Sequence, residues 1–152
     1  MTTRAALTLT ALSAALAMPA AAAAAASWST GAYRGAASNV MSKERRGTVS
    51  FTVTRTRARL DRLSVVLRCT DGKRRTFTIS DAGSGRLKPG PTGAGVSIEG
   101  RREIDGWDVD WDLVGGVKGS TFRGSVSSSA LLDSDTENQD CTLIGSFRAR
   151  RR

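Results

Sequence analysis

The sequence contains no histidine, and this absence removes several kinds of catalytic and metal site. A Ser-His-Asp triad or a Cys-His pair cannot be assembled, because both need an imidazole to carry the proton. Zinc loses its usual nitrogen ligand. The sequence also has no Gly-x-Ser-x-Gly motif and no phosphate-binding glycine loop. We therefore predict that the protein is not an enzyme and uses neither a metal nor a cofactor.

The first 26 residues contain no acidic side chain and only one basic residue, Arg4. An apolar run from Ala5 to Met18 follows Arg4, and an alanine tract then extends to Ala26. This is the three-part layout of a secretory signal peptide, and the run is shorter than the roughly 20 residues that span a membrane. We predict a signal peptide over residues 1–26 and a secreted, single domain over residues 27–152 with a basic C-terminal tail.

Cysteine is scarce, with two residues in the chain. In an exported protein an even pair of cysteines indicates a disulfide, and the alternative of two buried free thiols is disfavoured. Cys69 and Cys141 are therefore predicted to be bonded. Closing a loop of about 70 residues would stabilise the fold by about 4 kcal/mol through loop entropy.

No helical periodicity stands out after residue 26, and short segments of alternating residues take its place. Two of them, at 49–53 and 63–69, predict a hairpin. Arg55, Arg57 and Arg59 would point inward if the alternation continued, and an unpaired buried arginine is costly, so we place them at the tip. In a further segment Trp107 and Trp111 share a phase with Val109, which favours a core position over a sugar-binding platform. The whole pattern predicts an all-β, antiparallel sandwich of the immunoglobulin-like or jelly-roll-like kind.

Four segments carry a resemblance to a known group of proteins. They are Gly31-x-Tyr33-x-Gly35, Gly47-x-Val49-x-Phe51-x-Val53, the stretch from Leu60 to Cys69, and the stretch from Cys141 to Arg150. Together they resemble an uncharacterised family of small exported domains that is common in actinobacteria. The resemblance implies export and a β-sandwich fold, and it supplies no catalytic residue.

Acidic residues form three groups that could carry chemistry. Asp108, Asp110 and Asp112 superficially resemble a calcium loop, but the sixth position is not glycine, so a solvated strand face is favoured. The acidic loop at 133–140 is more flexible in principle, and whether it binds an ion is left open. Carboxylate pairs could also serve a glycosidase, which makes a carboxylate-dependent hydrolase our alternative function. The nearest candidates are Glu99, Glu103 and Asp105.

Basic residues dominate the charge, with a formal net charge of +9. They gather in two predicted clusters, one at the hairpin tip and one at its open end. A local excess of cations is usually a solvated surface, and the functional interpretation is a site for a polyanion. We predict weak binding of an anionic cell-envelope polymer by a monomer, with no specific nucleic acid. A secreted inhibitor or structural protein is a further alternative. The candidate residues are Arg55, Arg57, Arg59, Arg45, Arg46, Lys73, Arg74 and Arg75.

Overall fold

The structure is a computed structural model that describes residues 28–40, 43–133 and 138–152. The predicted signal peptide at 1–26 lies outside the described residues, as do Asp135 and Glu137 of the acidic loop. The described residues form ten strands and no helix, and so contain no helix that could cross a membrane. The strands are β1 (Gly31–Asn39), β2 (Arg45–Val53), β3 (Arg57–Cys69), β4 (Arg74–Ser80), β5 (Ser84–Arg86), β6 (Lys88–Gly90), β7 (Gly93–Ile104), β8 (Trp107–Lys118), β9 (Thr121–Asp133) and β10 (Asn138–Arg151).

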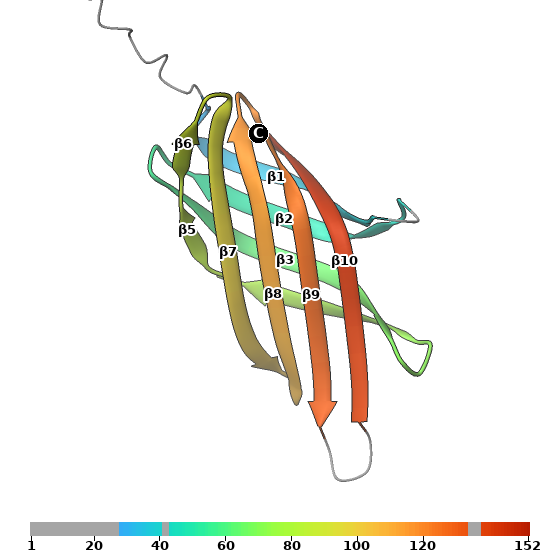
Figure 1. The fold of residues 1–152 in the computed structure, drawn as a ribbon. Coiled ribbons are helices and arrows are strands. Elements are labelled where there is room, and N and C mark those ends of the chain that lie inside the picture. The colour runs from blue at the N-terminus through green and yellow to red at the C-terminus, as the bar shows by residue number, and fades with distance from the viewer. Residues whose placement is uncertain (1–27, 41–42, 134–137) are drawn as a thin grey trace, which may run out of the picture.

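The long strands make two antiparallel meanders, β1–β4 and β7–β10, and the pairing of β1 with β10 joins them into one sheet. The sheet order is β4-β3-β2-β1-β10-β9-β8-β7-β6, so β4 and β6 are the edges. In Figure 1 the layer of β7–β10 crosses in front of the layer of β1–β4. A direct β3–β10 pairing closes a small ring of strands. The predicted antiparallel all-β class is confirmed, while the continuous sheet does not confirm a sandwich of two separate sheets.

The predicted hairpin is present as β2 and β3, but its turn is shorter than expected. The turn spans residues 54–56, so only Arg55 lies at the tip. Arg57 and Arg59 belong to β3 and point outward, because Ala58 and Leu60 alternate with them and are buried. Ser50 of β2 pairs with Arg62 and Phe51 with Leu60, so Asp61 is an extra residue in β3, and it shifts the buried phase of that strand. The break in periodicity therefore marks an irregular step in the ladder as well as a turn.

The core fills the space between the two layers. Phe51, Phe122 and Phe147 stack with ring centroids 4.5–5.5 Å apart, which adds aromatic contact to simple burial. Trp107 and Trp111 are buried as predicted, and the indole N–H of Trp111 donates to the Ala82 carbonyl at 2.7 Å. Both tryptophans are therefore core residues and do not form a platform for sugars.

The predicted disulfide between Cys69 and Cys141 is confirmed. The two cysteines lie opposite each other where β3 pairs with β10, and both side chains are buried. The bond thus joins the first meander to the last strand at the end of β3, where the layers meet. The opposite end of β10 pairs with the start of β1, and there the arginines of both strands face solvent.

Candidate anion-binding site

Five of the eight predicted polyanion-binding residues form ion pairs with carboxylates, four of them with a carboxylate within four residues in the sequence. At the hairpin, Arg59 forms an ion pair with Asp61 at 2.6 Å, and Arg57 donates a hydrogen bond to the Ser84 hydroxyl at 2.9 Å. Arg55 is exposed in the turn. Exposed pairs of this kind contribute little to stability, but they reduce the positive field that a ligand would meet.

The second predicted cluster is organised around Glu44. Its carboxylate contacts Arg46 at 2.6 Å and Arg74 at 3.0 Å. The side chain of Arg46 is 11% exposed, so this predicted ligand residue is a buried structural cation. The structure places residues at the start of β2 near residues that follow β3, as the predicted hairpin implies. Glu44 lies between Arg46 and Arg74 and contacts both.

The rest of that cluster surrounds Asp71. Lys73 and Arg75 lie 3.9 Å and 3.5 Å from its carboxylate. The guanidinium of Arg75 also lies over the Trp107 ring, 4.9 Å from the centroid, where a cation–π contact holds it. Of the eight predicted residues, Arg45 lies apart from these pairs and faces a different surface.

A depression of about 610 Å³ lies across β1, β2, β3 and β10, where β10 ends (label C in Figure 1). The strand register explains how its arginines meet: Arg150 is opposite Arg34, Arg34 is opposite Ser50, and Ser50 is opposite Arg62. These residues all belong to the outward phase of their strands, so they form one row across the sheet. The depression is lined by Arg34, Arg45, Arg62, Arg150, Arg151 and Arg152, together with Gly35, Thr48, Val49, Ser50 and Ser64.

Glycine allows the strands to approach closely under this row. A Cβ atom at Gly35 would lie 1.9 Å from the Arg148 carbonyl oxygen, which no side chain could tolerate without separating β1 from β10. The Gly35 position therefore keeps the arginines of the two strands next to each other. A side chain there would disturb both the pairing of the strands and the cationic row.

Two smaller depressions extend the row onto β9 and β8. One of about 500 Å³ is lined by Arg123 and Arg148, which are directly opposite each other on β9 and β10. Another of about 350 Å³ shares Arg123 and includes Lys118 beside exposed backbone at Gly95 and Gly116. We call the three depressions together the arginine trench. Its cations are Arg34, Arg45, Arg62, Lys118, Arg123, Arg148, Arg150, Arg151 and Arg152.

Among the described residues, no aspartate or glutamate lines any of these three depressions. Within the described ranges, none of the trench cations forms an ion pair with a carboxylate side chain. The positive charges therefore act on one another: the guanidinium of Arg123, then that of Arg150, lowers the pKa of Arg148 from its usual value. Uncompensated positive charge at this density attracts anions.

The dimensions of the trench suit a linear polyanion. From β9 to β3 it crosses four interstrand steps, which is about 19 Å at about 4.8 Å per step. All but one of its cations are arginines, whose planar guanidinium groups can donate two parallel hydrogen bonds to one phosphate, sulfate or carboxylate. The site can thus hold several anionic groups of one chain at once.

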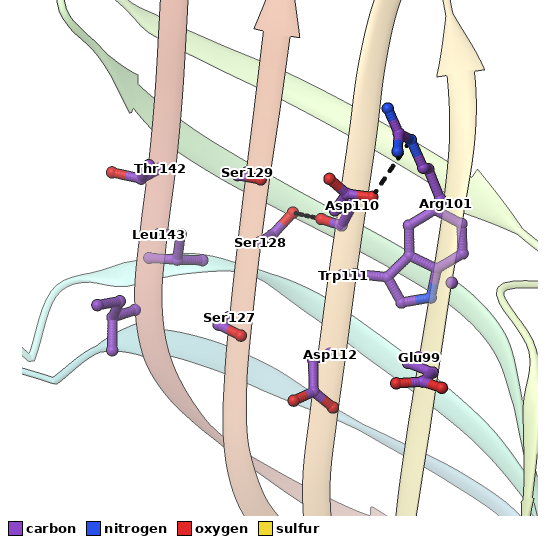
Figure 2. Close-up of a pocket in the computed structure, with 12 residues that line it drawn as sticks. Glu99, Arg101, Asp110, Trp111, Asp112, Ser127, Ser128, Ser129, Thr142 and Leu143 are labelled. Carbon is purple, nitrogen blue, oxygen red and sulfur yellow. Dashed lines mark hydrogen bonds and ion pairs between the residues drawn. The ribbon is translucent and has the colours of Figure 1, made fainter.

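A different depression, of about 640 Å³, lies on the outward surface of β7–β10. Figure 2 shows Glu99 and Asp112 side by side on neighbouring strands, with Ser127 next to Asp112. Above them Asp110 forms an ion pair with Arg101 at 3.7 Å. We call this the acidic depression. It is open to solvent, and its carboxylates are exposed.

The predicted carboxylate candidates are not brought together. Glu99 lies in the acidic depression, but Glu103 pairs across the ladder with Asp108, and Asp105 lies in the β7–β8 turn with a positive φ of 52°. The partner that the structure gives to Glu99 is Asp112, a residue of the alternating strand face. Among the described residues no group of three or more histidine, cysteine or acidic side chains could hold a metal ion.

Sequence reasoning missed the trench because its arginines are isolated along the chain. Arg34 and Arg123 each stand alone on their strands, so no local excess of charge marks them, and Arg62 lies among three other arginines of β3, so nothing in the sequence sets it apart. The one available signal was the alternation of Arg148, Arg150 and Arg152, which places three cations on one side of the last strand. The prediction of a basic C-terminal tail obscured that signal, because the predicted tail is in fact the end of β10, which continues to Arg151.

No protein-family model matches the chain, and no curated protein matches its sequence.

Proposed function

We propose that the protein is a secreted, non-enzymatic binding module that holds a linear anionic polymer of the cell envelope in the arginine trench. The observation that carries the proposal is that nine cations, and no acidic side chain of the described part of the chain, line the three depressions. The ligand class predicted from the sequence is kept, and the site moves from the hairpin clusters to residues on six strands. The two crossed layers then act as a rigid, sandwich-like scaffold for the row.

Export is part of the proposal. It is supported by the signal-peptide layout of residues 1–26 and by a disulfide of the kind that persists in oxidising compartments. The resemblance to small exported bacterial domains is consistent with this location. N-terminal sequencing of protein from the culture fluid should find a chain that begins near Ser27. A chain that still begins at Met1 or Thr2 would contradict export.

The binding proposal is tested with a pair of charge-matched variants. One replaces Arg34, Arg62 and Arg150 by serine, and the control replaces three arginines of the hairpin, Arg55, Arg57 and Arg59. Polyphosphate and heparin are titrated into each protein over a range of salt concentrations. Binding by the wild type should weaken steeply with salt, because neutralised anionic groups release counterions.

We expect the trench variant to lose at least about tenfold in affinity at low salt, and its salt slope to fall by about 2. The hairpin variant should bind like the wild type, because a carboxylate or hydroxyl already engages two of its three arginines. Equal losses in both variants would mean that total charge, and not the trench, governs binding. No binding by the wild type at low salt would refute the proposal.

A carboxylate-dependent hydrolase is the alternative, and one observation favours it. Glu99 and Asp112 are directly opposite each other on β7 and β8 and share the acidic depression. Incubation of the wild type with cell-wall glycans, followed by measurement of released reducing ends, tests this alternative. Hydrolysis that disappears in Glu99→Gln would replace the binding proposal with an enzymatic one.

A further inference from the structure

The outward surface of β7–β10, which we call the outer face, is divided into two halves of opposite charge. The acidic half lies toward the β7–β8 turn, and the basic half lies toward the β8–β9 turn. Strand pairing fixes this division, because outward residues form rows across the sheet. The acidic half holds Glu99, Glu103, Asp108, Asp110, Asp112 and Asp140, and the basic half holds Lys118, Arg123, Arg148 and Arg150.

Neither half is neutralised by the residues that the structure describes. In the acidic half Arg101 forms ion pairs with Asp108 and Asp110. The remaining carboxylates of that half, those of Glu99, Glu103, Asp112 and Asp140, have no basic partner among the residues that the structure describes. Like charges opposite each other in a ladder are unfavourable, so Glu99 beside Asp112 leaves an excess of negative charge that a partner could offset.

The same face carries exposed apolar side chains. Ile144 is 70% exposed, and Val114 and Leu131 are each 49% exposed. All three belong to the outward phase of β8, β9 or β10. Between them Ser125, Ser127 and Ser129 present only small hydroxyl groups along β9. A surface with small residues, exposed apolar groups and divided charge can be approached closely by a complementary surface.

We propose that two copies of this chain associate through their outer faces, about a two-fold axis that crosses the strands. Such an axis places the acidic half of each copy over the basic half of the other. A two-fold interface uses the same patch on both copies, and so it requires a patch that is complementary to itself. The divided charge of the outer face meets that requirement, and this dimer replaces the monomer predicted from the sequence.

The face is large enough for a specific dimer. Four strands at about 4.8 Å spacing and the six outward rows describe a patch of about 20 by 35 Å, or about 700 Å² per copy. The total of about 1,400 Å² falls within the range of about 1,200–2,000 Å² for stable protein interfaces. Charge complementarity would set the orientation of the two copies and make the association sensitive to salt.

This inference does not rest on the proposed function, although the two share residues. Arg123, Arg148 and Arg150 belong both to the basic half and to the arginine trench. A polyanion and a second copy would therefore compete for them. The experiment below uses no polymer, so failure of either proposal can be recognised without the other.

The decisive experiment uses two charge-reversed proteins and sedimentation velocity at low salt. The first carries Glu99→Lys, Asp112→Lys and Asp140→Lys, so that basic side chains outnumber acidic ones over its outer face. The second carries glutamate in place of Arg123, Arg148 and Arg150, so that its outer face is acidic. We expect the wild type to be a dimer at micromolar concentration and each reversed protein to be a monomer, because like charges then face each other.

An equimolar mixture of the two reversed proteins should restore a dimer, since a basic face again meets an acidic one. Reversal of Arg55, Arg57 and Arg59 to glutamate is the matched control and should leave the wild-type dimer intact. Circular dichroism and intact mass confirm folding and the disulfide in each protein. A monomeric wild type, or a mixture that stays monomeric while both proteins are folded, would overturn the proposal.

Discussion

The arginines of the hairpin and those of the arginine trench are the same chemical group in opposite electrostatic situations. Lys73, Arg74 and Arg75 are consecutive in sequence, and each lies within 4.0 Å of the carboxylate of Asp71 or Glu44. In the trench Arg34 and Arg150 meet from opposite ends of the chain, and neither has such a partner among the described residues. Density of charge along the sequence therefore did not predict which of the described cations lack a carboxylate partner.

The difference has a physical cause. A run of cations in one loop raises its own electrostatic energy, and a carboxylate a few residues away relieves it at little entropic cost. Cations that arrive on separate strands become neighbours only when the sheet forms. Their repulsion then opposes the favourable free energy that comes from burying the core beneath them. A surface that keeps such repulsion can bind an anion, whereas a neutralised surface cannot do so as strongly.

The largest expected effect is a loss of stability when the disulfide is removed. The disulfide lies beside the neutralised cluster and away from the trench, so its removal tests the two regions separately. Replacement of both Cys69 and Cys141 by serine should lower the free energy of unfolding by about 2–5 kcal/mol, measured by urea denaturation. Polyanion binding by the folded variant should be unchanged. A folded variant that no longer binds would show that the two regions are coupled through β10.

A smaller loss of stability is expected from Glu44→Gln. The change leaves the largely buried guanidinium of Arg46 without its charged partner, and it also removes the partner of Arg74. We expect the free energy of unfolding to fall by about 1–2 kcal/mol. Asp61→Asn is the control, because it breaks the ion pair of an exposed arginine, Arg59, and should change stability by less than about 1 kcal/mol. Equal effects would remove the distinction between the two pairs.

A third prediction compares single arginines by their contribution to binding. Arg62→Ser should reduce the salt slope of polyanion binding by about 0.7–0.9, the value for one neutralised phosphate. Arg59→Ser should leave the slope unchanged, because Asp61 already offsets that charge. Titrations with polyphosphate at several salt concentrations measure both slopes. A change of slope only in Arg59→Ser would return the site to the hairpin.

The smallest predicted effect is a gain in stability, opposite in sign to the losses predicted above. Positive neighbours lower the pKa of Arg148, so the folded protein holds this proton less tightly than the unfolded chain does, and the charge destabilises the fold. Arg148→Gln should therefore raise the melting temperature at low salt, and the gain should disappear as salt screens the repulsion. Arg59→Gln should lower it slightly or leave it unchanged. A lower melting temperature for Arg148→Gln at low salt would mean that its charge has a stabilising partner.

The parts of the fold that could be predicted were those that short segments determine. The alternation from Trp107 to Leu113 identified both the strand and its buried face, and the pairing of Cys69 with Cys141 followed from their number. The hairpin tip was placed wrongly because an irregular register, which alternation alone cannot reveal, shifts the phase in mid-strand.

The candidate site depends on information that one strand does not contain. That Arg34 lies opposite Arg150 follows from the pairing of the first strand with the last, and that Arg123 lies opposite Arg148 follows from the exact register of β9 and β10. A slip of one residue would move each of these side chains to the other face of the sheet. Strand order and register are decided by packing across the whole sheet, so the trench was not predictable from the sequence.

The edges of the sheet have a consequence for aggregation. The long strands β8, β9 and β10, of 12–14 residues, would readily pair with other chains if their backbones were free, but each has a ladder partner on both sides. The order of the sheet instead places the seven-residue β4 and the three-residue β6 at its two edges. β6 contains Pro89, which has no N–H to offer a further strand, and β4 begins with Arg74 and Arg75. The molecule can thus present a broad polar surface while its edges resist the addition of strands that leads to fibrils.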